Sequence, residues 1–474
     1  MMRNRIAAWL VLATFVLASP AFSATGDEED RIAALEAKVD LLVEELTRLK
    51  TEREADSAID SEVTLAPNPE MQEQIGVLAR EVERVKRAVA VPEEKELKSV
   101  YGFGPAASKV YLKERGLSIG GYGEGFFKAI TKNKYDRDNT ADWLRGVLYF
   151  GYKFSDRIIF NSEIEFEHAA TSKNGSASVE FAQIDFLLHE GEIGAVNATA
   201  GLLLTPMGFL NLLHEPTYFY GVSRPSPEKQ IIPSTWREIG AGFFGNLFND
   251  TVSYKVYTQA GLDAAGFKSS GFRSARQKGS KSKANDWAFV ARVDWLPVDG
   301  LLVGGSVWTG ASGQNQTLTN KAGTKYALDD IWTTIWELHA QYDWKGLHTR
   351  ALFTMSHVGN AKQLSNATDR SIASRSVGGY AEVAYDILPL FLPDPTMRLE
   401  PFYRFEWTET QNKLPDGIQA NQYDNFRVNM VGLQFYPHPQ VVLKLDYRNV
   451  YALGRNADGE QRPDEIQVGL GYVF

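Results

Sequence analysis

Five charged residues, Glu215, Arg224, Glu228, Lys229 and Arg237, are embedded in an otherwise apolar segment, residues 205–237. The apolar side chains of this segment include Met207, Phe209, Leu210, Leu212, Leu213, Tyr218, Phe219, Tyr220, Ile231, Ile232 and Trp236. A connection of more than about 15 residues with that much apolar surface is expected to pack against protein. Charges held on a packed segment can set the electric field of a confined passage, which is the chemistry of ion selection. Two alternatives stay open: the aromatic run could stack on a sugar ring, or the segment could be a structural lid.

A second segment is strongly basic. The stretch "FKSSGFRSARQKGSKSK" carries Lys268, Arg273, Arg276, Lys278, Lys281 and Lys283 and contains no acidic residue. Such a run could gather anions at the mouth of a passage. It could equally bind lipopolysaccharide phosphates or remain disordered.

Catalytic chemistry has little support. The seven histidines are scattered singly, and neither a nucleophile elbow nor a zinc-binding histidine motif accompanies them. Ser356 and His357 are adjacent near the end of an expected strand, where neighbouring side chains point to opposite faces. Cysteine is absent, which excludes thiol chemistry and disulfides. We therefore expect no enzyme, cofactor or metal site, and a hydrolytic barrel is the least favoured alternative.

The elements that position these residues are expected to be β-strands. In "TTIWELHAQYDW", apolar Trp336 and Leu338 alternate with polar Glu337 and His339. This alternation indicates one apolar face and one polar face in contact with water, here called the wet face. Sixteen such strands are predicted near residues 117–127, 142–154, 158–168, 178–189, 196–204, 238–247, 250–260, 286–295, 301–309, 332–344, 347–357, 376–387, 397–408, 426–436, 440–450 and 464–474. The wet face carries both basic and acidic residues, for example Arg404, Lys444 and Glu406, so neither sign dominates.

Loop lengths point to the fold class. Connections such as "SDR", "FND" and "KG" are tight, and the connections between them are long and polar. An even number of strands, with short and long connections alternating along the chain, is typical of a transmembrane β-barrel. The chain ends in "QVGLGYVF", an alternating strand with a terminal aromatic residue, which suits a last strand that closes against the first in lipid. A sixteen-stranded antiparallel transmembrane β-barrel over residues 117–474 is therefore predicted.

The residues before the barrel follow different patterns. Residues 1–23 have two arginines, an apolar run and small residues, as a cleaved signal peptide does. Residues 27–91 hold two short heptad seams, the first through Leu35, Leu42 and Leu49, and predict a periplasmic coiled coil. Residues 92–116 are expected to be a linker.

Several motifs resemble a known family. "GPAASKVY" and "SIGGYGE" (residues 104–111 and 118–124), with "IIPSTWREIGAGFFG" (residues 231–245), resemble uncharacterised porin-like outer-membrane proteins. "GLLLTPMG" and "GLQFYPHP" (residues 201–208 and 432–439) are similar to segments of the phosphate-selective porin O and P family. The resemblance implies a homotrimeric sixteen-stranded channel, in some members with an N-terminal coiled coil. Leu204 stands where that family often has a lysine, so the resemblance does not extend to phosphate selectivity.

The function expected from these patterns is an outer-membrane porin for small hydrophilic or ionic solutes, constricted by residues 205–237. Its expected partners are outer-membrane lipid, lipopolysaccharide, the solute and two further copies of the chain. The net charge of -9 argues against nucleic acid. The alternative is a barrel that acts mainly as a structural envelope tether through its coiled coil.

Overall fold

A computed structural model describes residues 97–172, 174–392 and 396–474. The predicted signal peptide, residues 1–23, and the predicted coiled coil, residues 27–91, lie outside the described residues. The first five residues of the expected linker, 92–96, do so too.

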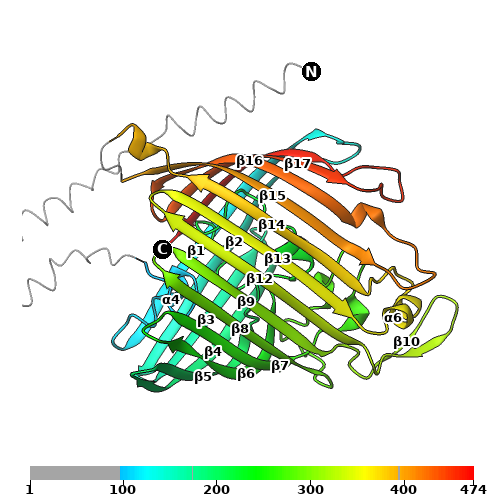
Figure 1. Cartoon of the computed structure of the whole chain (residues 1–474), viewed down its shortest axis with the longest axis horizontal. Coiled ribbons are helices and arrows are strands. Elements are labelled where there is room, and N and C mark those ends of the chain that lie inside the picture. Colours follow the sequence, from blue (N-terminus) through cyan, green and yellow to red (C-terminus); the bar gives the residue numbers. More distant parts are fainter. Residues whose placement is uncertain (1–96, 173, 393–395) are drawn as a thin grey trace, which may run out of the picture. The chain divides into compact units, whose positions relative to one another are not determined.

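In the described part of the chain, sixteen antiparallel strands form one closed barrel (Figure 1). They are β1 (Gly116–Lys132), β2 (Thr140–Ser155), β3 (Ile158–Glu167), β4 (Ser176–Gly191), β5 (Gly194–Leu204), β6 (Arg237–Leu247), β7 (Val252–Ala260), β8 (Trp287–Val298), β9 (Leu301–Ala311), β12 (Trp332–Trp344), β13 (Leu347–Val358), β14 (Arg375–Tyr385), β15 (Arg398–Lys413), β16 (Asn425–His438), β17 (Val441–Ala452) and β18 (Asp464–Val473). Two short strands, β10 (Thr317–Thr319) and β11 (Lys325–Ala327), pair with each other in the connection after β9. The predicted strand count and barrel are confirmed.

The last strand closes the barrel against the first. Tyr122 of β1 is paired with Val473 of β18, and the pairing continues to Lys132 and Asp464. Beyond the last ladder residue, the amides of Gly121 and Phe474 each donate to the other's carbonyl, at 3.0 and 2.9 Å. The apolar ending of the chain is therefore the seam of the barrel, where every strand edge is paired.

Short connections gather at one end of the barrel. The tightest joins β12 to β13 through Lys345 and Gly346, whose φ angles of 47° and 81° suit a two-residue hairpin turn. The connection between β14 and β15 is also at this end but is longer, and it contains the exposed 3₁₀-helix η3 (Leu388–Leu390). The expected alternation of short and long connections thus has one exception.

The wall is apolar outside and polar inside. Trp295 and Leu338 are 52% and 59% exposed on the outer face, whereas Arg292 and Glu337 on the inner face are 7% and 1% exposed. An apolar outer belt with a polar interior is the arrangement of a barrel that spans a bilayer. The helices described in the structure are all too short or too polar to cross a membrane.

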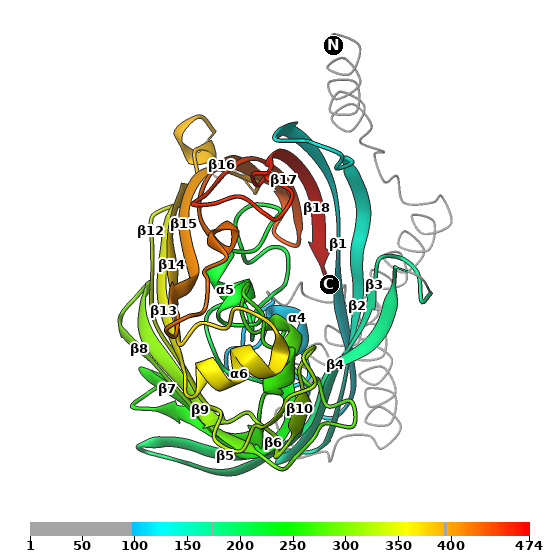
Figure 2. The ribbon, with the colours of Figure 1, turned by 90° about the vertical axis from the view of Figure 1, so that its right-hand side faces the viewer.

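The helices are short and belong to the connections. They are α4 (Pro105–Ser108), α5 (Pro227–Gln230), α6 (Ala361–Thr368), η1 (Ala264–Gly266), η2 (Arg273–Ala275), η3 and η4 (Gln422–Asp424). Figure 2 shows α5 within the ring of strands and α6 crossing the end of the barrel that faces the viewer. An apolar cluster joins the connection after β5, the connection after β7, α6 and the inner wall, through residues that include Ile232, Phe272, Leu364 and Trp308.

Candidate functional site

Residues 205–237, hereafter the inner loop, lie inside the barrel between β5 and β6. Met207, Leu210, Ile231, Ile232 and Trp236, apolar residues of the sequence pattern above, are all fully buried. Proline at position 227 starts α5, because its fixed φ angle and missing amide suit the first turn of a helix. The inner loop is therefore a packed structural element, as its apolar content predicts.

Hydrogen bonds fasten the inner loop to opposite sides of the wall. Arg404 of β15 donates to the carbonyls of Tyr220 and Ser223, at 2.6 Å each. Across the barrel, the ring of His214 hydrogen-bonds with Glu163 of β3, with 3.2 Å between Nε2 and Oε1 (Figure 2). Because strands on both sides hold it, the inner loop spans the lumen.

Close approach to the wall requires a glycine at one point of the inner loop. Gly221 has a φ angle of 74°, and a Cβ atom there would meet the sulfur of Met430 on β16 at 2.6 Å. Lys444 of β17 donates to its carbonyl at 3.0 Å and to that of Phe219 at 2.7 Å. Arg404, Lys444 and Glu406, expected on the wet face, all contact the inner loop inside the barrel, which confirms that assignment.

Two of the five predicted constriction residues are buried carboxylates that bind protein groups. Glu228 accepts hydrogen bonds from the amide of Leu210 at 2.7 Å and from the hydroxyl of Tyr380 at 2.6 Å. Burial raises the pKa of Glu228 above its ordinary value. Glu215 accepts from the amide of Ala106 at 3.1 Å, and burial raises the pKa of Glu215 to about 8. Both side chains position the inner loop.

The two predicted arginines differ in their partners. Arg237 is buried and forms an ion pair with Glu180 of β4, at 2.5 Å. Arg224 is partly exposed, and its nearest hydrogen-bond acceptor is the carbonyl of His214, at 3.4 Å. Burial, followed by the nearby charge of Arg145, lowers the pKa of Arg224 to about 10. Arg224 is thus less completely neutralised than Arg237.

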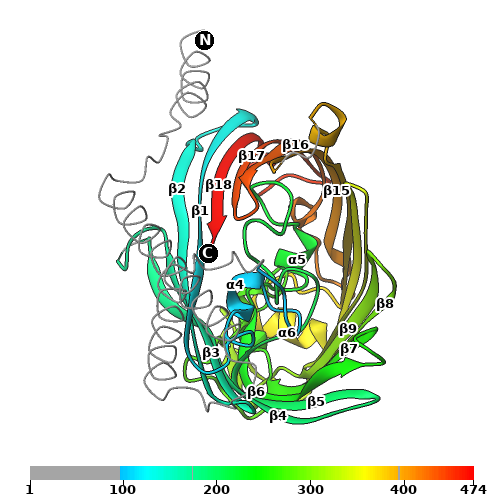
Figure 3. The same cartoon turned by 90° about the vertical axis from the view of Figure 1, so that its left-hand side faces the viewer.

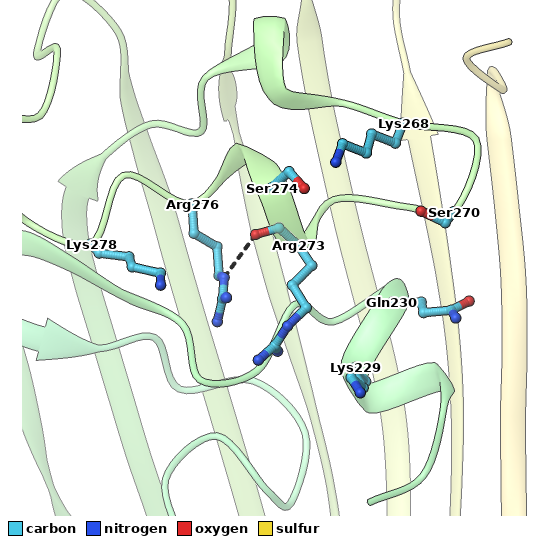
Figure 4. A pocket seen from close by; sticks show the side chains of 8 residues that line it. All are labelled: Lys229, Gln230, Lys268, Ser270, Arg273, Ser274, Arg276 and Lys278. Atoms are coloured by element: carbon cyan, nitrogen blue, oxygen red, sulfur yellow. Dashed lines mark hydrogen bonds between the residues drawn. The ribbon is translucent and has the colours of Figure 1, made fainter. Parts of the chain in front are cut away.

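Lys229 is separate from the other four residues because it projects into a cavity. The cavity has a volume of about 520 Å³ and is lined by Lys229, Gln230, Lys268, Ser270, Arg273, Ser274, Arg276 and Lys278 (Figure 4). We call it the basic pocket. The Lys229 side chain is exposed to the cavity, but the cavity itself is enclosed by the barrel. Burial inside the barrel lowers the pKa of Lys229 to about 8.

Backbone carbonyls orient the two arginines of the basic pocket. The Nε of Arg276 donates to the carbonyl of Arg273 at 2.9 Å, the bond drawn in Figure 4. Its Nη1 donates to the carbonyl of Thr235 at 2.5 Å, and Arg273 donates to the carbonyl of Ser234. The carbonyls of Thr235 and Ser234 belong to the inner loop, so the basic stretch, residues 267–283, is folded onto the inner loop. Burial, then the charge of Arg273, lowers the pKa of Arg276 to about 9.

The structure thus joins residues that the sequence presented as two groups. Lys229 of the first group meets Lys268, Arg273, Arg276 and Lys278 of the second. The remaining members of the basic run lie outside the pocket: Lys281 is exposed, and Lys283 pairs with Asp263 at 2.9 Å. All the lining residues described are basic or neutral, so the basic pocket is suited to a negatively charged ligand.

One part of the lumen was not anticipated from the sequence. Residues 97–115, part of the expected linker, pack inside the barrel with Phe103, Ala106, Ala107 and Val110 buried. Figure 3 shows α4 within the ring of strands. The aromatic residues of "YGFG" and "KVY" were the available signal, because a solvated linker has little use for them.

The adjacent serine and histidine that the sequence analysis considered for catalysis lie on opposite faces of their strand. Ser356 is buried and His357 is exposed, so they face opposite sides of β13, as predicted. Among the described residues, no group of histidine and acidic side chains could hold a metal ion. His339 is buried between Glu337 and Asp294, at 2.8 and 3.0 Å, which gives it a structural role in the wall.

Comparison with solved structures finds outer-membrane proteins. The chain is similar to OmpF of Salmonella typhi, solved as a complex with daunomycin, with 14% identity over 76% of this chain and 98% of that chain and a TM-score of 0.48. For the outer membrane channel DcaP of Acinetobacter baumannii, the identity is 13%, the coverage 76% and 97%, and the TM-score 0.46. For a loop L8 deletion mutant of OmpT of Vibrio cholerae, these values are 12%, 76% and 100%, and 0.47.

Comparison of sequences finds a much nearer relative. No model of a known protein family matches the chain. An uncharacterised protein of Aquifex aeolicus is 34% identical over 379 residues, which cover 77% of this chain and 82% of the relative. This chain belongs to the same family as that uncharacterised Aquifex protein.

Proposed function

We propose that the protein is an outer-membrane channel through which small hydrophilic or ionic solutes diffuse, with the inner loop as its constriction. The observation that carries the proposal is the attachment of the inner loop to opposite walls inside a closed barrel, through Arg404 of β15 on one side and Glu163 of β3 on the other. Such a loop narrows the lumen, and its charges attract or repel the ions and solutes that pass through it. The predicted signal peptide supports export to the envelope.

The wall itself favours neither sign of charge. Arg145 pairs with Glu124 at 2.5 Å, and Arg404 pairs with Glu406 at 2.8 Å. Because such pairs cancel at short range, they contribute little to the field experienced by a passing ion. The basic pocket is different, since several like charges there face one cavity. We therefore propose a preference for anions, which are concentrated at the mouth before they reach the constriction.

Reversal potentials across planar bilayers in a KCl gradient test both parts of this proposal. The wild-type protein should conduct and should favour chloride. Lys268→Glu with Lys278→Glu reverses two exposed charges in the basic pocket and should shift the reversal potential toward cations. Lys281→Glu with Lys325→Glu makes the same change in net charge on exposed residues outside the pocket and should shift it much less.

Two results would count against the proposal. Absence of conductance in the wild-type protein, when a known porin conducts in the same bilayers, would remove the channel function. Equal shifts in the pocket variant and the control variant would remove the basic pocket as the source of selectivity, leaving only the total charge of the chain.

We also propose that three copies assemble in the outer membrane in contact with lipopolysaccharide, as the family resemblance implies. Mass measurement of the detergent-solubilised protein, corrected for bound detergent, tests the trimer. A monomeric mass under conditions that preserve the folded barrel would contradict it.

A further inference from the structure

Residues 97–115, hereafter the plug segment, lie at the barrel end where the short connections gather. Their wall contacts come from strand residues next to those connections. Asn161, near the start of β3, donates to the carbonyl of Ala107 at 2.9 Å. Lys255, near the start of β7, donates to the carbonyl of Tyr101 at 2.6 Å. The inner loop enters the lumen from the opposite end, so the two elements meet within it.

Side chains rather than sheet pairing hold the plug segment in place. Phe103 packs against Phe181 of β4 with ring centroids 5.5 Å apart, and the hydroxyl of Tyr111 donates to Asp185. The strand ladder begins only at Gly116, paired with Lys153. The plug segment can therefore leave the lumen without breaking a ladder hydrogen bond, whereas any strand would have to break many.

One carboxylate and a buried apolar cluster, which includes Phe103, Ala106 and Leu212, join the plug segment to the inner loop. Glu215 accepts from the amide of Ala106, in the first turn of α4. Its other oxygen, Oε2, is buried and has no hydrogen-bond partner among the described residues, so the contact satisfies only half of the carboxylate. Gly104 lies directly against the same carboxylate, and a Cβ atom there would overlap it.

We infer that the plug segment is a gate: it closes one end of the lumen, and the contact between Glu215 and Ala106 latches it to the inner loop. The inference goes beyond the proposed channel function and rests on it. Opening consists of withdrawal of the plug segment through the barrel end at which it lies. A carboxylate with one oxygen unpaired suits this role, because it holds the closed state by only a modest free energy. Mechanical force on the plug segment or binding of a solute can overcome a free energy of that size.

Gly104→Ala tests the latch, because the added methyl group displaces the Glu215 carboxylate while the φ angle of -56° at Gly104 accepts alanine. The matched control is Gly146→Ala in β2, where a Cβ atom would meet only the Trp143 indole nitrogen, at 3.8 Å. Single-channel recording should show a roughly three- to tenfold higher open fraction for Gly104→Ala, the range expected when one buried hydrogen bond is lost. Gly146→Ala should match the wild-type protein.

A disulfide provides the opposite perturbation, because the chain has no cysteine of its own. Val110 faces Gly151 of β2, with 2.6 Å between the Cβ of Val110 and a Cβ placed at Gly151. A shift of about 1 Å would bring cysteines at these positions to disulfide geometry. Oxidised Val110→Cys/Gly151→Cys protein should stay closed, and reductant should restore wild-type openings.

A labelling measurement separates failure of the gate from failure of the channel. Ala107 is buried in the closed state, so Ala107→Cys should react slowly with a water-soluble maleimide. Adding Gly104→Ala should accelerate the reaction by a similar three- to tenfold factor. Unchanged labelling, or identical currents in the locked and reduced proteins, would overturn the gate. Faster labelling without current in any variant would support the latch and overturn the channel.

Discussion

The hydroxyl of Tyr380 on β14 donates a 2.6 Å hydrogen bond to the carboxylate of Glu228, 152 residues earlier in the chain. The same carboxylate accepts from the amide of Leu210 at 2.7 Å, so it ties two parts of the inner loop to the wall. Both Tyr380 and Glu228 are fully or almost fully buried. A buried carboxylate has no water to replace a lost donor, which makes this contact a strong determinant of where the inner loop lies.

Tyr380→Phe should loosen the inner loop. Removing the hydroxyl leaves one oxygen of Glu228 without its donor, at a cost of about 1–3 kcal/mol. Limited proteolysis of the inner loop in the detergent-solubilised barrel should therefore become faster. Tyr403→Phe is the control, because the hydroxyl of Tyr403 donates to Asn429 on the exposed outer face. Equal proteolysis of both variants would show that the Tyr380–Glu228 contact does not hold the inner loop.

Phe474→Ala, or removal of residues 472–474, should lower the amount of barrel inserted in the outer membrane while export continues. The truncation removes the two hydrogen bonds between Gly121 and Phe474 and shortens the closing seam. Heat-modifiable mobility on gels of outer-membrane fractions measures insertion. Phe391→Ala, at an exposed aromatic residue in the connection after β14, should leave insertion unchanged. Wild-type levels of the folded truncation would contradict the prediction.

Stability should fall as pH rises between about 4.5 and 8, partly because of Glu215. Burial raises the pKa of this carboxyl group from 4.5 to about 8. Below pH 4.5 the group is protonated in both the folded and the unfolded state, so its contribution to stability is fully present. As pH rises, the unfolded state ionises first, and that contribution is lost by the time pH passes 8.

Thermal unfolding of the solubilised barrel across this pH range measures the effect. Glu215→Gln removes the ionisation and should make the unfolding temperature less dependent on pH. Glu192→Gln, at an exposed glutamate in the turn between β4 and β5, should keep the wild-type dependence. A Glu215→Gln profile parallel to that of the wild type would assign the dependence to other groups.

Replacing Leu35, Leu42 and Leu49 by glutamine should abolish helical association of residues 27–91 and leave barrel conductance largely unchanged. These leucines form the predicted heptad seam, and a polar seam provides no apolar contact between helices. Chemical cross-linking of residues 27–91 reads out the association, and bilayer recording reads out the channel. Loss of the barrel oligomer together with the conductance would show that the coiled coil is required for barrel assembly.

Local patterns were sufficient for the barrel wall. The alternation around Glu337 and Leu338 identifies the faces of β12, because successive side chains of any strand point to opposite sides. The position of the Lys345–Gly346 turn follows from its glycine, which adopts a positive φ angle without steric cost. Apolar content likewise indicated that residues 205–237 would be packed, since such a surface cannot remain in water.

The sequence by itself therefore determined the strands, their faces, their turns and the closing seam, all of which depend on residues near one another in the chain or on strand order. Only the tertiary structure decided that Lys229 lies beside Arg273 and Arg276, that Glu215 and Glu228 are anchors, and that residues 97–115 enter the lumen. These outcomes depend on how far each connection reaches across a closed barrel and which wall residues it meets. Such contacts join positions far apart in the chain, so no local period encodes them.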